Sequence, residues 1–163
     1  MFPVVMHKGA YGAYRAQLEL ILQIPIHANQ EVRGLIEAGF PASIINTLGN
    51  LGILDSQSRD SIIPLRTLRW RLARGQRLSV GESDRLFRFV HIMAMAAALF
   101  GSIDKSERWL KQPQDRLSGK SPIAMLSTSV GMWQVEEFLK QVTDGFANCC
   151  SLDGQQAQTP SVS

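Results

Sequence analysis

Arginine and tryptophan side chains gather on one face of a short helix, which we predict to begin after Pro64 and to end at Gly75. Leu65, Leu68 and Leu72 lie along one side of this helix, the side that would pack inward. We expect the residues on or beside the opposite side to face DNA: Arg66, Thr67, Arg69, Trp70, Arg71 and Arg74. Arginine binds phosphates and guanine edges in fixed geometry, and an exposed tryptophan among arginines favours a contact surface over a merely solvated face.

The distribution of charge supports this interpretation. Residues 51–100 contain eight arginines and four acidic residues, a net charge of +4, whereas residues 1–50 are neutral and residues 101–163 carry −1. The positive excess of the chain therefore surrounds the predicted helix and consists entirely of arginine. A basic stretch of this kind is also typical of a solvated helix face, which is the alternative.

No group of residues has the types and spacing that catalysis or metal binding needs. His7, His27 and His91 are far apart in the sequence, and Cys149 and Cys150 are adjacent with no second pair to complete a zinc site. The glycines form neither a dinucleotide-binding nor a phosphate-binding loop. We therefore expect no enzyme activity, no metal and no cofactor. We expect His91, on an apolar helix, to pack in the core.

Composition places the chain among ordinary globular proteins. Its 163 residues are 45% hydrophobic and 19% charged, with no disulfide framework. The longest apolar run, residues 89–101, contains His91 and is shorter than the roughly 20 residues that cross a bilayer. The N-terminus lacks the pattern of a signal peptide. We therefore expect a cytoplasmic protein without a membrane partner.

Helical periodicity runs through most of the chain, with Pro and Gly between the segments. Residues 18–24 fit a short helix or a strand equally well, whereas the segments from residue 30 onward are helical. Ser79 and Glu82 form a capping box before a long helix that is apolar almost all round. Because one small half-domain could not cover such a helix, we expect a homodimer built on one apolar stripe: Leu86, Val90, Met93, Ala97 and Phe100.

The expected fold is all-α, with a helix-turn-helix-like N-terminal half joined by the long apolar helix to a C-terminal helical half. We divide it into an N-terminal extension (1–29), a DNA-binding region (30–78), a central dimerisation helix (79–102), a C-terminal domain (103–147) and a flexible polar tail (148–163). We expect Thr128 to cap the last helix and Gly145 to end it.

Residues 64–146 resemble the Xre-type antitoxins of RES–Xre toxin–antitoxin pairs, the MbcA/ParS/Xre family. The matching segments, in order, are RTLRWRL, LSVGESDRL, the apolar helix ending in FG, WL before Pro113, SPIAMLSTSVG and VEEFL. The resemblance covers about half of the chain. The helix before the arginine-rich one departs from it, because Gln57, Asp60 and Ser61 fall where we expect apolar residues.

The resemblance implies an all-helical, dimeric antitoxin that binds a RES-domain toxin and represses its own operon by binding double-stranded operator DNA. RES toxins consume NAD or transfer ADP-ribose from it, and the antitoxin blocks their pocket. Within the C-terminal domain the implied toxin-binding residues are Trp109, Leu126, Gly131 and Phe138. Core packing is the alternative role for Trp109, Leu126 and Phe138. Two other functions remain open: a stand-alone helix-turn-helix transcriptional regulator, and an adaptor whose arginine face meets an acidic protein.

Overall fold

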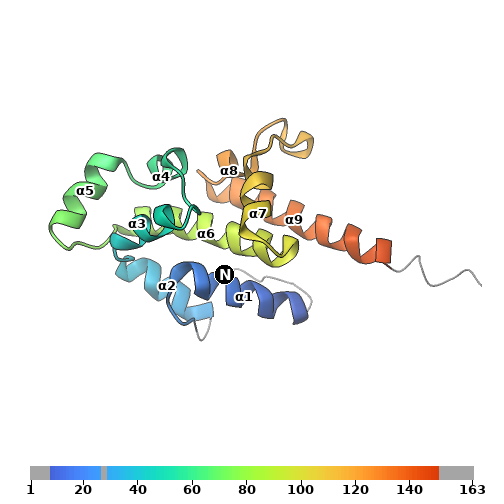
Figure 1. The fold of residues 1–163 in the computed structure, drawn as a ribbon, viewed down its shortest axis with the longest axis horizontal. Helices are drawn as coiled ribbons and strands as arrows, with labels where there is room; N and C mark the ends of the chain where they lie inside the picture. Colours follow the sequence, from blue (N-terminus) through green and yellow to red (C-terminus); the bar gives the residue numbers. More distant parts are fainter. Residues whose placement is uncertain (1–7, 27–28, 151–163) are drawn as a thin grey trace, which may run out of the picture.

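The computed structural model describes residues 8–26 and 29–150, and within them the chain folds into helices joined by short loops (Figure 1). These residues contain no strand, which confirms the all-α class expected from the sequence. The elements are α1 (Lys8–Leu22), α2 (Asn29–Ala38), α3 (Ser43–Asn50), α4 (Ser56–Ile62), α5 (Leu65–Ala73), α6 (Val80–Phe100), α7 (Ile103–Lys111), the 3₁₀ helix η1 (Asp115–Leu117), α8 (Pro122–Met125) and α9 (Ser129–Cys150).

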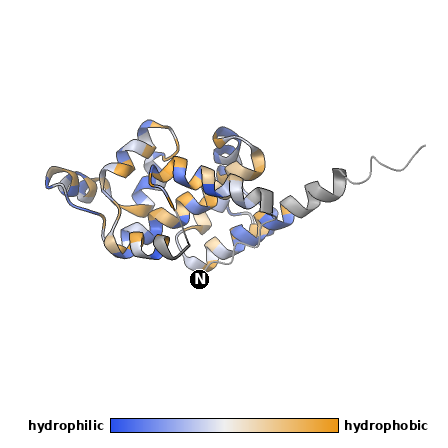
Figure 2. Ribbon diagram, turned by 90° about the horizontal axis from the view of Figure 1, so that it is seen from below, coloured by the Kyte–Doolittle hydropathy of each residue, from blue (hydrophilic) through white to orange (hydrophobic). Residues whose placement is uncertain are grey.

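Helix α6 runs through the middle of the molecule and packs against α1, α2, α4, α7 and α9 (Figures 1 and 2). It begins with the predicted capping box: the Ser79 hydroxyl accepts a hydrogen bond from the Glu82 backbone N–H, and the Glu82 carboxylate accepts one from the Ser79 N–H. Every residue from Leu86 to Ala97 is buried. One helix therefore supplies the core of both halves.

The apolar faces of α6 are covered by the chain itself. Leu86, Val90 and Met93 have no exposed surface, and Ala97 is 1% exposed. Among the described elements, helix α1 makes the most extensive contact with α6. It covers apolar residues of α6 that the sequence analysis assigned to a dimer interface. The expected dimer stripe is therefore corrected: these four residues are core residues of one chain. Phe100, the fifth, is half-buried.

A buried polar chain links α1, α6 and α9. The Tyr14 hydroxyl lies 2.7 Å from His91 Nδ1, and His91 Nε2 lies 3.5 Å from Glu136, which also pairs with Lys140 at 3.0 Å. Because a carboxylate only accepts hydrogen bonds, the proton belongs on Nε2, and Nδ1 accepts from tyrosine when the ring is neutral. Burial alone would raise the pKa of Glu136, but His91 and Lys140 outweigh it and lower that pKa. His91 is 1% exposed, as expected of a core histidine.

Helix α4 packs in a different register from the one expected. It buries Ser58 and Ile62, whereas Gln57, Asp60 and Ser61 are exposed. The expectation that these three polar residues occupy apolar positions is therefore wrong. The helix is short, and its inward side uses two residues spaced by four, which is helical spacing.

Asp55 joins the two halves of the molecule. Its carboxylate accepts a hydrogen bond from the Ser58 N–H at 2.8 Å, capping α4, and its second oxygen lies 2.9 Å from the Lys111 ammonium at the end of α7. Burial acts to raise the pKa of Asp55, but the Ser58 and Lys111 interactions outweigh it and lower that pKa to about 2.

We expect Asp55 to make stability depend on pH. Its pKa is about 2 in the folded chain and ordinarily 3.8, so its contribution to the free energy of unfolding is complete above pH 3.8 and is lost as the pH falls toward 2. Urea unfolding between pH 5 and pH 2 measures this loss. The Asp55→Asn variant keeps a capping side chain and should lose less stability over that interval than the parent chain. Parallel pH profiles would contradict the prediction.

The ends of the C-terminal helices agree only in part with expectation. The Thr128 hydroxyl accepts a hydrogen bond from the Gly131 N–H at 3.0 Å, so Thr128 caps α9 as predicted. Gly145 does not end that helix, which continues to Cys150. The start of the predicted tail, residues 148–150, is therefore helical, and residues 151–163 lie outside the described residues.

The described residues contain neither a single membrane-spanning helix nor a cluster of metal-binding side chains. No single helix there is long and apolar enough to cross a membrane, and α6 with α7 meets that measure only as a pair bent by 118°. No three His, Cys, Asp or Glu side chains in the described ranges lie close enough together to hold a metal ion.

Candidate functional site

Helix α5 presents the expected basic face to solvent. Leu68 is 2% exposed on the inner side, while Trp70 is 47% exposed on the outer side. The Arg74 guanidinium lies 4.3 Å from the centre of the Trp70 ring, a cation–π contact that holds both side chains on one surface. Arg66 and Arg69 are exposed beside them, and Thr67 is half-buried. Four of the six predicted residues thus share an open surface, which we call the α5 face: Arg66, Arg69, Trp70 and Arg74.

Arg71, the remaining predicted residue, points elsewhere. Its Nε lies 3.0 Å from the Glu82 carboxylate, and its Nη1 donates to the Arg77 carbonyl at 3.2 Å. Burial would raise the pKa of Glu82, but the Ser79 N–H and Arg71 outweigh it and lower that pKa. Arg71 therefore ties α5 to the start of α6 and orients the α5 face.

In the C-terminal half, three of the predicted toxin-binding residues contribute to packing. The Trp109 ring lies 5.7 Å from the Phe100 ring and 5.5 Å from the Phe138 ring, so these aromatics join α6, α7 and α9. Leu126 is 6% exposed. Trp109 and Phe138 are each half-buried and keep some surface for a partner.

Gly131, the fourth predicted residue, fixes the turn between α8 and α9. A Cβ atom at this position would overlap the backbone carbonyl of Met125. Arg88 of α6 donates to the Ser127 carbonyl of the same turn at 3.1 Å and pairs with Asp84 at 2.9 Å. Hydrogen bonds from Arg88 of α6 and from Gly131 to Thr128 within the turn therefore fix its backbone. The turn in this way sets the direction of α9.

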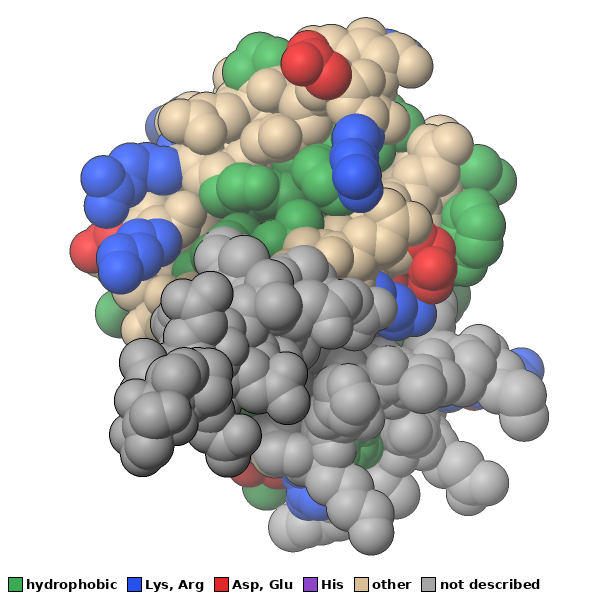
Figure 3. All heavy atoms as spheres, turned by 90° about the vertical axis from the view of Figure 1, so that its right-hand side faces the viewer, with side chains coloured by type: hydrophobic (Ala, Val, Ile, Leu, Met, Phe, Trp, Pro, Cys, Tyr) green, Lys and Arg blue, Asp and Glu red, His purple; other side chains and the backbone are tan. Residues whose placement is uncertain are grey.

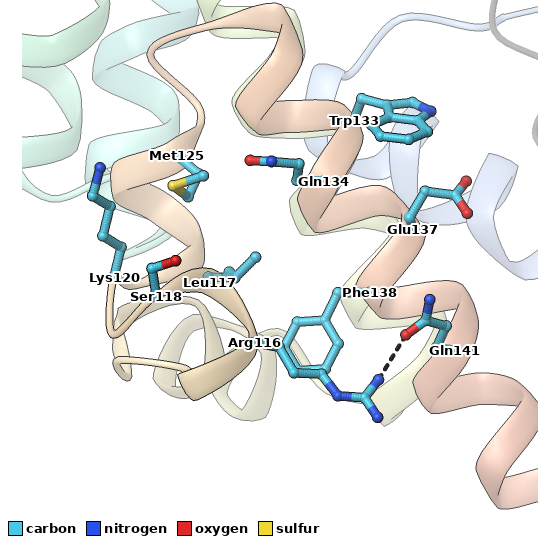
Figure 4. Close-up of a pocket in the computed structure, with 10 residues that line it drawn as sticks. All are labelled: Arg116, Leu117, Ser118, Lys120, Met125, Trp133, Gln134, Glu137, Phe138 and Gln141. Atoms are coloured by element: carbon cyan, nitrogen blue, oxygen red, sulfur yellow. Dashed lines mark hydrogen bonds between the residues drawn. The ribbon is translucent and has the colours of Figure 1, made fainter.

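A groove lies between α9 and the segment from η1 to α8 (Figure 4). Its volume is about 420 Å³. The residues that line it are Arg116, Leu117, Ser118, Lys120, Met125, Trp133, Gln134, Glu137, Phe138 and Gln141. At the end of the molecule toward which α9 points, hydrophobic side chains lie at the surface with both basic and acidic side chains around them (Figure 3). Of the predicted residues, Phe138 lines this groove.

Sequence reasoning missed Trp133, which is 60% exposed on the first turns of α9. The signal was available, because Trp133 lies 100° away from the stripe that begins at Met132 and so could not belong to the core face. Val130, also outside that stripe, is 69% exposed. A large aromatic side chain displayed to solvent next to a groove is typical of a binding surface.

Known antitoxins are similar to this chain over most of its length. The chain is 46% identical over 147 residues to Antitoxin Xre of Pseudomonas putida, an alignment that covers 90% of this chain and 92% of the relative. The chain belongs to the Xre antitoxin family. Two more distant Xre antitoxins match as well: one from Yersinia enterocolitica at 30% identity (68% of this chain, 76% of the relative) and one from Photorhabdus laumondii at 26% (76% and 86%).

The model of the Xre/MbcA/ParS antitoxin C-terminal toxin-binding domain matches residues 95–145. This range begins within the last two turns of α6 and takes in α7, η1, α8 and most of α9. It therefore contains the whole groove of this Xre antitoxin, together with Trp133 and the aromatic cluster around Trp109. The α5 face lies outside that range, in the other half of the antitoxin.

Proposed function

We propose that this antitoxin neutralises a RES-domain toxin through its C-terminal half and binds operator DNA through the α5 face, repressing its own operon. The observation that carries the first part is the match of residues 95–145 to a toxin-binding domain. This region also contains a groove of mixed polar and apolar lining and an exposed tryptophan, Trp133. Neutralisation then needs no catalysis, because covering the NAD pocket of the toxin is sufficient. Both partners belong to the cytoplasm.

The α5 face supports the DNA-binding part. Its arginines are exposed on one side of a helix, at the end of the molecule far from α9 (Figure 1). Phosphate contacts by such side chains supply most of the affinity of a protein for DNA and orient it on the duplex. A stand-alone regulator would use the same face but would have no use for the groove.

We further propose that two copies bind a palindromic operator as a homodimer. The buried stripe of α6 cannot form the interface, so the dimer must use other surface of the chain. Sedimentation of the full chain at micromolar concentration measures the state directly, and an 18 kDa monomer would contradict it.

One double variant tests both parts of the proposal. Arg66→Ala with Arg74→Ala removes two exposed cations from the α5 face without touching the core. We expect DNA affinity to fall and the salt dependence of binding to lose about one unit of slope for each phosphate contact removed. The matched control is Arg33→Ala, an exposed arginine on α2.

The same variants are then co-expressed with a RES-domain toxin while cellular NAD and promoter activity are followed. The double variant should still preserve NAD and cell growth but no longer repress the promoter. The parent chain and the Arg33 control should do both. Failure of the parent chain to bind the toxin would refute the RES assignment. Normal promoter binding by the double variant would refute the α5 face.

A further inference from the structure

Two cations, Arg116 and Lys120, are among the residues that line the groove between η1 and α9. Arg116 donates to the neutral side-chain oxygen of Gln141 at 2.6 Å, and its guanidinium lies 5.5 Å from the centre of the Phe138 ring (Figure 4). Lys120 lines the groove nearby and is exposed. Among the side chains that the structure describes, no carboxylate forms an ion pair with either cation.

Glu137, the one acidic residue among those that line the groove, does not pair with Arg116 or Lys120. Glu137 lies 2.9 Å from the Lys140 ammonium, which also pairs with Glu136 at 3.0 Å. The carboxylate of Glu137 is thus directed to Lys140 on α9 itself, and among the described side chains it forms no ion pair with Arg116 or Lys120. Asp115, the other charged residue of η1, does not line the groove.

Both cations are held on a rigid turn. The Gln114 N–H donates to the Lys120 carbonyl at 3.0 Å, and the Gly119 N–H donates back to the Gln114 carbonyl at 3.0 Å. Ser118 and Gly119 adopt positive φ angles of 56° and 74°, which close the turn tightly. These hydrogen bonds fix the backbone of the turn, so binding has to order the two side chains but not the turn itself.

The other lining residues are partly polar (Ser118, Gln134, Glu137 and Gln141), and four of them are apolar. Leu117 is buried, Met125 and Phe138 are half-buried, and Trp133 stands exposed at the margin. A volume of about 420 Å³ is near the lower end of the 300–1,000 Å³ that ligand pockets usually enclose, so it fits one or two side chains rather than a folded element.

We infer that this groove receives an acidic segment of the toxin, with an apolar or aromatic side chain against Phe138 and Trp133 and a carboxylate against Arg116. The inference rests on the proposed function and names the chemistry of the toxin surface that this site recognises. Charge complementarity gives such a contact its orientation and its rate of association, and the buried aromatic contact gives it affinity.

Full-length variants and the RES-domain toxin test this assignment in a binding assay at low and high salt. Arg116→Glu should raise Kd at least about tenfold at low salt and less at 0.5 M salt, with the neutral Arg116→Gln in between. Trp133→Ala should raise Kd about 30-fold or more at both salt concentrations. The matched control is Lys105→Glu, an exposed cation of α7 outside the groove, which should stay within about twofold.

Two further measurements make the result decisive. Replacing the contacting carboxylate of the toxin with lysine should restore binding to Arg116→Glu, which a merely misfolded variant could not show. Equal unfolding midpoints for parent and variants confirm that the fold is intact. If the parent chain binds the toxin but Arg116→Glu and Lys105→Glu have equal effects, the inference is wrong and the proposed function is unaffected. Absence of parent binding would overturn the proposed function with it.

The tail of this chain is the competing occupant. A chain that ends at Cys150 should bind the toxin no more tightly than the parent chain does. If it binds tenfold more tightly, the tail fills the groove in the free protein and the inference is wrong.

Discussion

Adding a single methyl group at Gly131 is expected to abolish toxin neutralisation. The new Cβ would overlap the Met125 carbonyl, a backbone atom that cannot rotate out of the way as a long side chain would. Either α8 or the first turn of α9 must shift, and with it Met125 and Trp133 on the two sides of the groove. We expect Gly131→Ala to lower the free energy of unfolding by about 1–3 kcal/mol, the usual cost of overpacking.

The matched control for Gly131→Ala is Gly12→Ala, in the middle of α1. A Cβ at Gly12 meets nothing within 4 Å, and the residue is exposed. Because alanine favours a helix over glycine, this control should be stabilised by roughly 0.5–1 kcal/mol. Urea unfolding and protection of cells from the toxin measure the two variants. Equal unfolding midpoints for Gly131→Ala and the parent chain, with full protection, would show that the turn tolerates the methyl group.

The largest expected loss of stability follows from truncating Leu18. This side chain is 3% exposed and belongs to the core that α1 shares with α6. Leu18→Ala leaves a cavity in that core, for which we expect a loss of about 2–5 kcal/mol in the free energy of unfolding. Natural domains are stable by only about 5–15 kcal/mol, so we expect a larger fraction of the variant molecules to be unfolded at 37 °C.

Leu20, two residues further along α1, gives an unusually close control. It is the same residue type on the same helix but is 61% exposed. Leu20→Ala should change the free energy of unfolding by less than about 0.5 kcal/mol. Urea unfolding of the two variants side by side therefore measures burial alone. Equal losses would mean that α1 does not pack on α6 as described.

Local signals in the sequence predicted the helices well because their causes are local. Pro64 immediately before α5, the capping box of Ser79 and Glu82, and the cap at Thr128 all act within one turn of the chain. Gly145 was misread as a helix end, since a glycine within an otherwise continuous helix costs only about 1 kcal/mol and tertiary packing can override it.

What the sequence did not predict depends on contacts between distant residues. An apolar stripe on α6 looks the same whether another helix of the chain or a second copy covers it, so Val90 and Met93 were assigned to a dimer. Arg71 was placed on the α5 face because its partner, Glu82, lies eleven residues away. The groove forms because η1 turns back toward α9, and the hydrophobic periodicity of the sequence does not predict such a turn.

The site could be predicted in outline and not in detail. Spacing on one helix was enough to identify Arg66, Trp70 and Arg74 as a surface, because Leu68 fixes which side faces inward. In the toxin-binding half, Trp109 and Phe138 were predicted to bind the toxin, but their rings mainly pack against each other. Trp133, the most exposed aromatic residue described, was overlooked.

Helix α6 contributes buried residues to both halves, so neither half has a hydrophobic core of its own. A protease that cuts within α1, or heat that detaches it, would uncover the face of α6 that α1 covers. The α5 face and the groove would then be lost in one cooperative step rather than one after the other. We expect a cell that degrades this antitoxin to release both partners of the proposed function, the toxin and the promoter, at the same time.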